Sequence, residues 1–163
     1  MTPDLSAWTD FLAAVAGATA ALLGLFFVSL SLNLEKVLAG NGLTERAEQA
    51  LIQLLAALMV ALLLLMPGLS LFVAGSGVLV IAVVTGIIGT VLAARSLRRA
   101  KGYGRVYTAN LVLFELAILP WVIGGLLLMA GNADGAYWLA AGICLSIAKA
   151  AFDSWVFLVE INR

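Results

Sequence analysis

Long apolar stretches, separated by short polar or glycine-rich segments, fill most of the 163-residue chain. Because a helix rises about 1.5 Å per residue, crossing the apolar core of a bilayer takes about 20 such residues. The pattern therefore predicts an all-α protein, a polytopic transmembrane helical bundle of about five spans that form a single domain over residues 1–163. The expected helices cover residues 8–38, 44–73, 77–100, 106–130 and 136–162.

The connection between the second and third spans is the least defined part of this pattern. Pro67-Gly68 weakens the second span, and Gly75-Ser76-Gly77 marks a further break. Residues 67–77 form either a loop between two spans or a re-entrant segment, and the pattern leaves both open. We place the loop near residues 74–76.

Basic residues give the predicted spans an orientation. They concentrate around the third connection, in Arg95, Arg98, Arg99, Lys101 and Arg105. Since Lys and Arg favour the cytoplasmic side, five spans place the N-terminus outside and the C-terminus inside. The alternative role for this connection is a docking patch for anionic lipids.

Composition agrees with a membrane protein. Hydrophobic residues make up 64% of the chain and charged residues 11%, whereas a soluble domain carries about a quarter charged residues. The formal net charge is zero, which argues against nucleic acid as a partner. The chain has no His and a single Cys, Cys144, so His-based metal sites and catalytic triads are excluded, and we expect neither a metal nor a cofactor.

Three ionisable residues lie inside predicted spans: Glu115 in the fourth, and Lys149 and Asp153 in the fifth. Each costs about 2.5–3.5 kcal/mol to insert as a charge at the centre of a membrane helix. Lys149 and Asp153 are one helical turn apart, and Glu115 lies at a similar predicted depth, so we expect one cluster. Two acids and one base would leave a negative charge that a proton or a visiting cation neutralises.

Further polar residues fall in the same half of the predicted spans as this cluster. We expect them to line a water-accessible vestibule that opens to the cytoplasm. They are Ser29, Asn33, Gln53, Asn110 and Ser146.

These residues favour a small ion- or proton-handling membrane protein, similar to a channel or transporter. Glu115 and Asp153 would bind the ion or proton, and Lys149 would act as a tethered counter-charge. The alternative is a non-enzymatic interaction or regulatory subunit of a larger membrane complex, in which the cluster only fixes the helix register. A third possibility is a pocket for a lipid or small metabolite between helices.

No enzymatic activity is expected. Ser146-Ile147-Ala148-Lys149 matches the S-x-x-K string of penicillin-recognising acylases, but the companion motifs are absent. An intramembrane aspartyl protease needs two Asp on different helices, and Asp153 alone is well inside a span. The expected partners are membrane lipids, a second copy of the chain in a homo-oligomer, and another membrane protein.

Small residues form a stripe on each of two predicted helices. Helix association in lipid relies on close packing at such residues, so the two stripes would meet within one chain or pair across an oligomer. The first stripe is Ala13, Gly17, Ala20, Ala21 and Gly24, and the second is Ala82, Gly86, Gly89, Thr90 and Ala93.

Two segments carry a resemblance to a known family. Residues 18–35 (ATAALLGLFFVSLSLNLE) and 154–163 (SWVFLVEINR) resemble small uncharacterised bacterial multi-pass membrane proteins. Some of these carry an automatic label as modulators of a membrane-bound AAA protease. The resemblance implies a place in the bacterial cytoplasmic membrane and no catalytic residues.

Overall fold

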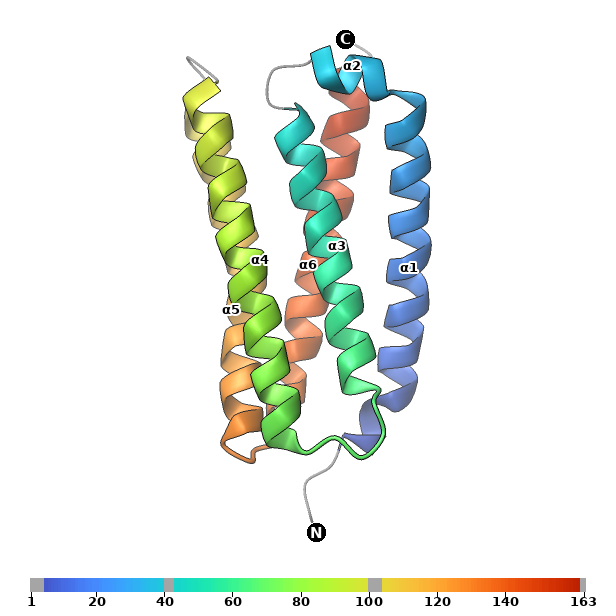
Figure 1. Cartoon of the computed structure of the whole chain (residues 1–163), viewed down its shortest axis with the longest axis vertical. Helices are drawn as coiled ribbons and strands as arrows, with labels where there is room; N and C mark the ends of the chain where they lie inside the picture. Colours follow the sequence, from blue (N-terminus) through green and yellow to red (C-terminus); the bar gives the residue numbers. More distant parts are fainter. Residues whose placement is uncertain (1–4, 40–42, 100–103, 162–163) are drawn as a thin grey trace.

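The computed structural model describes residues 5–39, 43–99 and 104–161, and all regular structure in these ranges is helical. Five long helices lie side by side (Figure 1). The elements in chain order are the 3-10 helix η1 (Ser6–Trp8), α1 (Thr9–Leu32), α2 (Leu34–Ala39), α3 (Leu43–Leu64), α4 (Leu71–Arg99), α5 (Gly104–Met129) and α6 (Gly135–Ile161).

Within the described residues, five helices are long and apolar enough to cross a membrane. This finding confirms the predicted helical, multi-pass character of the chain. The spans are Ser6–Leu32, Thr44–Leu64, Leu71–Leu97, Thr108–Met129 and Gly135–Trp155.

Successive long helices run in opposite directions, so their termini gather at two opposite ends of the molecule (Figure 1). One end holds α2, and there α3 and α5 begin while α4 and α6 finish; we call it the α2 end. The other holds η1 and the α3–α4 and α5–α6 connections; we call it the η1 end. The helix α3 packs against α1, α4 and α6, and α5 packs against α4 and α6.

The prediction of one continuous helix over residues 8–38 is wrong in its C-terminal part. The structure has a break at Asn33, between α1 and α2. The Asn33 side-chain amide donates to the Ser29 carbonyl at 2.9 Å, and its backbone N–H donates to the Leu30 carbonyl at 3.2 Å. These bonds end α1 at Leu32, and α2 continues as a separate short helix across the end of the molecule (Figure 1).

The connection between the second and third spans also differs from the prediction. The helix α3 ends at Leu64 rather than near residue 73, and α4 already begins at Leu71. Pro67 cannot continue a helix, and Gly68 adopts a φ of 73°, which is the left-handed conformation that favours glycine. Ser70 then caps α4, since its hydroxyl accepts a bond from the Val73 N–H at 3.4 Å.

The glycines expected to break the chain lie instead inside α4, where they permit close packing. A Cβ at Gly75 would lie 2.5 Å from the Gly125 carbonyl oxygen of α5, and one at Gly77 would lie 2.6 Å from the Leu63 side chain. Gly75 needs glycine because the backbone of α5 comes too close for a larger residue, whereas the neighbour of Gly77 is the end of a flexible side chain.

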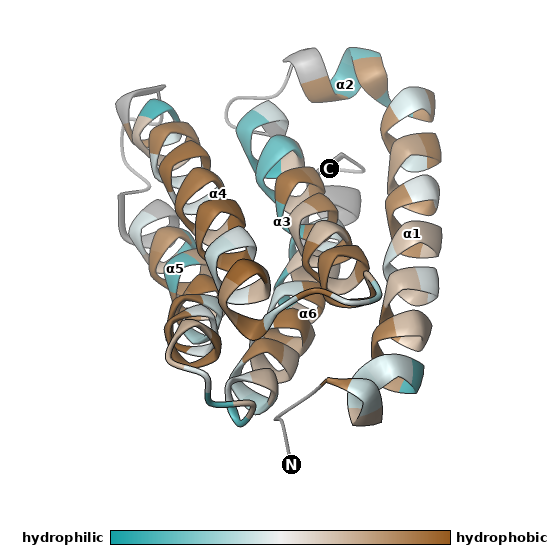
Figure 2. Ribbon diagram, turned by 60° about the horizontal axis from the view of Figure 1, so that its bottom comes forward, coloured by the Kyte–Doolittle hydropathy of each residue, from teal (hydrophilic) through white to brown (hydrophobic). Residues whose placement is uncertain are grey.

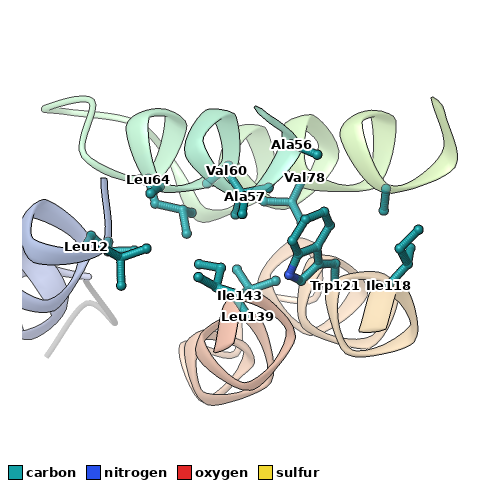
Figure 3. Packing of buried hydrophobic residues seen from close by; sticks show 14 of the residues in the cluster. Leu12, Ala56, Ala57, Val60, Leu64, Val78, Ile118, Trp121, Leu139 and Ile143 are labelled. Carbon is teal, nitrogen blue, oxygen red and sulfur yellow. The ribbon is translucent and has the colours of Figure 1, made fainter. Parts of the chain in front are cut away.

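The largest apolar core joins all five long helices in the half of the molecule toward the η1 end. The fully buried Trp121 ring lies among α3, α4 and α6 side chains (Figure 3). Hydrophobic residues extend along the long helices (Figure 2), and many large apolar side chains are exposed, with Leu25 at 69% and Ile87 at 60%. An apolar core beneath an apolar surface is what a lipid environment requires of a helical protein.

The two small-residue stripes do not meet within the chain. A Cβ at Gly17 or Gly24 of α1 would have no other atom within 4 Å, because this stripe faces outward. The buried members of the α4 stripe face α5, where a Cβ at Gly89 would lie 2.1 Å from the Phe114 ring. Of the two alternatives for these stripes, pairing with each other within one protomer is therefore wrong.

Candidate functional site

Most of the buried polar side chains lie in the half of the molecule toward the α2 end. Lys149 and Asp153 form an ion pair one turn apart on α6, in which the Lys149 ammonium donates to Asp153 Oδ2. The two side chains are 6% and 1% exposed. The Lys149 Nζ also lies 5.6 Å from the centroid of the Phe114 ring, close enough for a cation–π interaction.

Glu115 takes no part in this ion pair, so the described contacts do not join the three residues of the predicted cluster. The Thr90 hydroxyl of α4 donates to Glu115 Oε1 at 2.9 Å, and Oε2 lies 3.8 Å from where a Cβ of Gly86 would be. Among the described side chains, Lys149 forms its ion pair with Asp153 and not with Glu115.

Glu115 does not pair with Lys149 because of the direction in which α5 presents consecutive residues. Neighbouring residues on a helix point about 100° apart, and it is Phe114 that packs beside Lys149. Glu115 is consequently turned toward α4, where it is partly exposed. The depth predicted from the sequence does not determine this direction.

Three further hydrogen bonds tie α3 to its neighbours. Gln49 Nε2 donates to the Gly89 carbonyl of α4 at 3.0 Å, and Asn110 Nδ2 of α5 donates to Gln49 Oε1 at 2.8 Å. Gln53 Nε2 donates to the Ser146 hydroxyl of α6 at 3.5 Å. Sequence reasoning missed Gln49, although Gln49 and Gln53 are one turn apart on a predicted span and therefore share a face.

The predicted vestibule residues lie in separate places rather than around one cavity. Gln53 and Ser146 form one buried contact, and Asn110 belongs to another. Asn33 bonds to its own helix, and Ser29 lines an apolar groove at the surface.

Some buried polar atoms have no hydrogen-bond partner in the described part of the chain. They include Asp153 Oδ1, Gln53 Oε1 and Thr19 Oγ1. An unsatisfied buried polar atom costs about 1–3 kcal/mol, so a water molecule at any of these atoms would stabilise the structure, and at the Asp153 carboxylate a proton would do so as well.

A groove with a volume of about 310 Å³ opens between α1 and α6, with α3 as its floor. We call it the α1–α6 groove. It does not include Lys149 or Asp153. Its lining residues are Leu22, Leu25, Phe26, Ser29, Leu54, Ala150, Ala151, Ser154 and Trp155.

The described residues contain no group of three or more His, Cys, Asp or Glu side chains that could hold a metal ion. No protein-family model, curated protein or solved structure matches this chain. The resemblance to small bacterial membrane proteins therefore stays a prediction.

Proposed function

We propose that this protein is a non-enzymatic interaction protein of the membrane, which binds a neighbouring membrane helix through the outward face of α4 and α5. The observation that carries the proposal is the position of Glu115. Its carboxyl group is partly exposed, and no Lys or Arg among the described side chains pairs with it.

Glu115 is well inside the apolar part of the chain. It lies two turns from the α2-end limit of the span Thr108–Met129, which is about 10 Å by the helix rise. Thr90 lies equally far inside the span Leu71–Leu97. At this depth an acid that faces lipid is costly, and such residues normally face a polar partner.

The surroundings of Glu115 suit contact with another helix. Polar side chains and close approach at small residues drive helix association in lipid, and Glu115, Thr90 and Gly86 supply both. Exposed apolar side chains flank them at helical spacing. We call this surface the Glu115 face and define it by Val83, Ile87, Thr90, Val112, Glu115 and Leu119.

Charge balance favours this function over ion handling at Lys149 and Asp153. Without Glu115, that pair holds one positive and one negative charge, so it needs no additional proton or cation for neutrality. We assign it a structural role, in which the two charges neutralise each other on α6 and Lys149 contacts Phe114 of α5.

The test is photocrosslinking in intact membranes with benzoylphenylalanine in place of Val112. We expect a specific crosslinked product, whose mass shows whether the partner is a second copy or another membrane protein. The matched control carries the same group in place of Leu145, an exposed residue of α6. Equal, diffuse crosslinking from both positions would overturn the proposal.

Proton handling is the second candidate, favoured by the unpartnered Asp153 Oδ1 and Gln53 Oε1. Those acceptors would take part in proton movement through the half of the molecule near the α2 end. Its test is proton flux into liposomes, which the double variant Lys149→Met/Asp153→Leu would abolish without leaving a lone buried charge. Liposomes that stay as proton-tight as protein-free ones under an applied voltage would rule it out.

For location, we propose the cell membrane with the N-terminus outside. Lys36, Arg46 and Arg95 lie toward the α2 end, whereas Asp10 and Asp134 lie toward the η1 end. This separation supports a cytoplasmic α2 end.

A further inference from the structure

The α1–α6 groove exists because α1 is attached to the rest of the molecule mainly through α3. The side of α1 that faces α6 thus stays uncovered, and Leu54 of α3 closes the bottom of the gap. Leu25 and Trp155 stand at its edges, 69% and 67% exposed. The groove therefore opens sideways, onto the surface that the membrane surrounds.

Its volume of about 310 Å³ is enough for part of one acyl chain. An apolar cavity of about 150 Å³ holds one benzene molecule, so the groove has room for about a dozen carbon atoms. This volume is at the lower limit of small-molecule sites, which begin at about 300 Å³.

The lining is polarised along the groove. Leu22 and Leu25 lie deeper in the apolar region, whereas Ser29 and Ser154 lie toward the α2 end. Beyond the serines, α2 at the same end of the molecule carries the exposed side chains Glu35 and Lys36, of which the Lys36 ammonium is the group that attracts a phosphate. Apolar walls, then hydroxyl groups, then a positive charge match the order of groups in a phospholipid, from acyl chain through glycerol ester to phosphate.

We infer that the α1–α6 groove binds one acyl chain of a phospholipid, with the glycerol end of the lipid near Ser29 and Ser154. The bound chain fills the space between α1 and α6 and holds α1 in place. This inference is independent of the Glu115 face, which lies on α4 and α5.

The experiment uses the purified full-length protein in maltoside micelles. A phosphatidylglycerol with a diazirine on one acyl chain is added at rising concentration, and labelled residues are mapped by mass spectrometry after illumination. We expect saturable labelling of the groove residues on α1 and α6, at lipid concentrations where other lipid-facing positions are not yet labelled.

Ala151→Phe places a ring in the groove and should abolish this labelling. Ala94→Phe is the matched control, because Ala94 is exposed on α4, away from the groove, and should leave the labelling unchanged. Ser29→Leu fills the groove from the α1 side and gives a second, independent variant if Ala151→Phe fails to fold. Non-saturable labelling spread over all lipid-facing helices, or groove labelling that survives a folded filling variant, would overturn the inference. So would a second copy of the chain crosslinked within the groove.

Discussion

The ion pair between Lys149 and Asp153 is buried among α3, α5 and α6. The free-energy cost of burying the two charges is offset because both lie on the same side of one helix. Phe114 lies over the Lys149 ammonium, and Asp153 is 1% exposed. A charge in this position is tolerated because its partner is one turn away. Removing either partner leaves the other charge uncompensated.

Lys149→Met should therefore lower the free energy of unfolding by about 3–5 kcal/mol, the usual cost of breaking a buried pair. Replacing both residues in Lys149→Met/Asp153→Leu should recover most of this loss, because no lone charge remains. Denaturant unfolding in mixed micelles measures both variants. A single variant as stable as the unchanged protein would contradict a structural role for the pair.

At the level of the helices, the apolar pattern predicts most of the elements but not their exact limits. It identifies five spans, because their length and hydropathy depend on local sequence alone. It places the α3–α4 break at Gly75–Gly77 instead of Pro67–Gly68, since a glycine at a turn and a glycine at a helix contact look alike in sequence. Gly75 allows the backbone of Gly125 to come close. Because Gly125 is distant in the chain, the local sequence around Gly75 does not reveal this contact.

The same limit applies to the candidate site. The spacing of Lys149 and Asp153 suggests their pairing because both residues lie on one helix. Whether Glu115 joins them depends on the rotation of α5 relative to α4 and α6, which follows from the packing of Phe114 and Trp121. That packing is a property of several helices together and cannot be read from one span.

Helix packing at Gly142 gives a prediction at this level. A Cβ at Gly142 would lie 2.2 Å from the Trp121 ring, so Gly142→Ala should force α5 and α6 apart and destabilise the protein by about 1–3 kcal/mol. Gly24→Ala is the matched control, because nothing lies within 4 Å of the added carbon and alanine favours a helix. Thermal unfolding in detergent should show a loss for the first variant and none for the second, and equal stability of the two would contradict this packing.

For the molecule as a whole, the two ends differ in charge, and this difference predicts how it lies in the membrane. In a Cys144→Ser background, Asp134→Cys should react with an impermeant maleimide added to intact cells. Lys36→Cys should react once the cells are made permeable, because the α2 end is proposed to be cytoplasmic. The reverse labelling pattern would contradict the orientation.

The central claim is that Glu115 binds a neighbouring membrane helix, whereas the Lys149–Asp153 pair stabilises the fold. The most direct measurement is the yield of the crosslinked product from the photoreactive group at position 112, in membranes, after Glu115→Leu. We predict that the product is lost while the stability of the isolated protein is unchanged or increased, because a costly carboxyl has been removed from the membrane region. An undiminished yield of the same product after Glu115→Leu would contradict the claim.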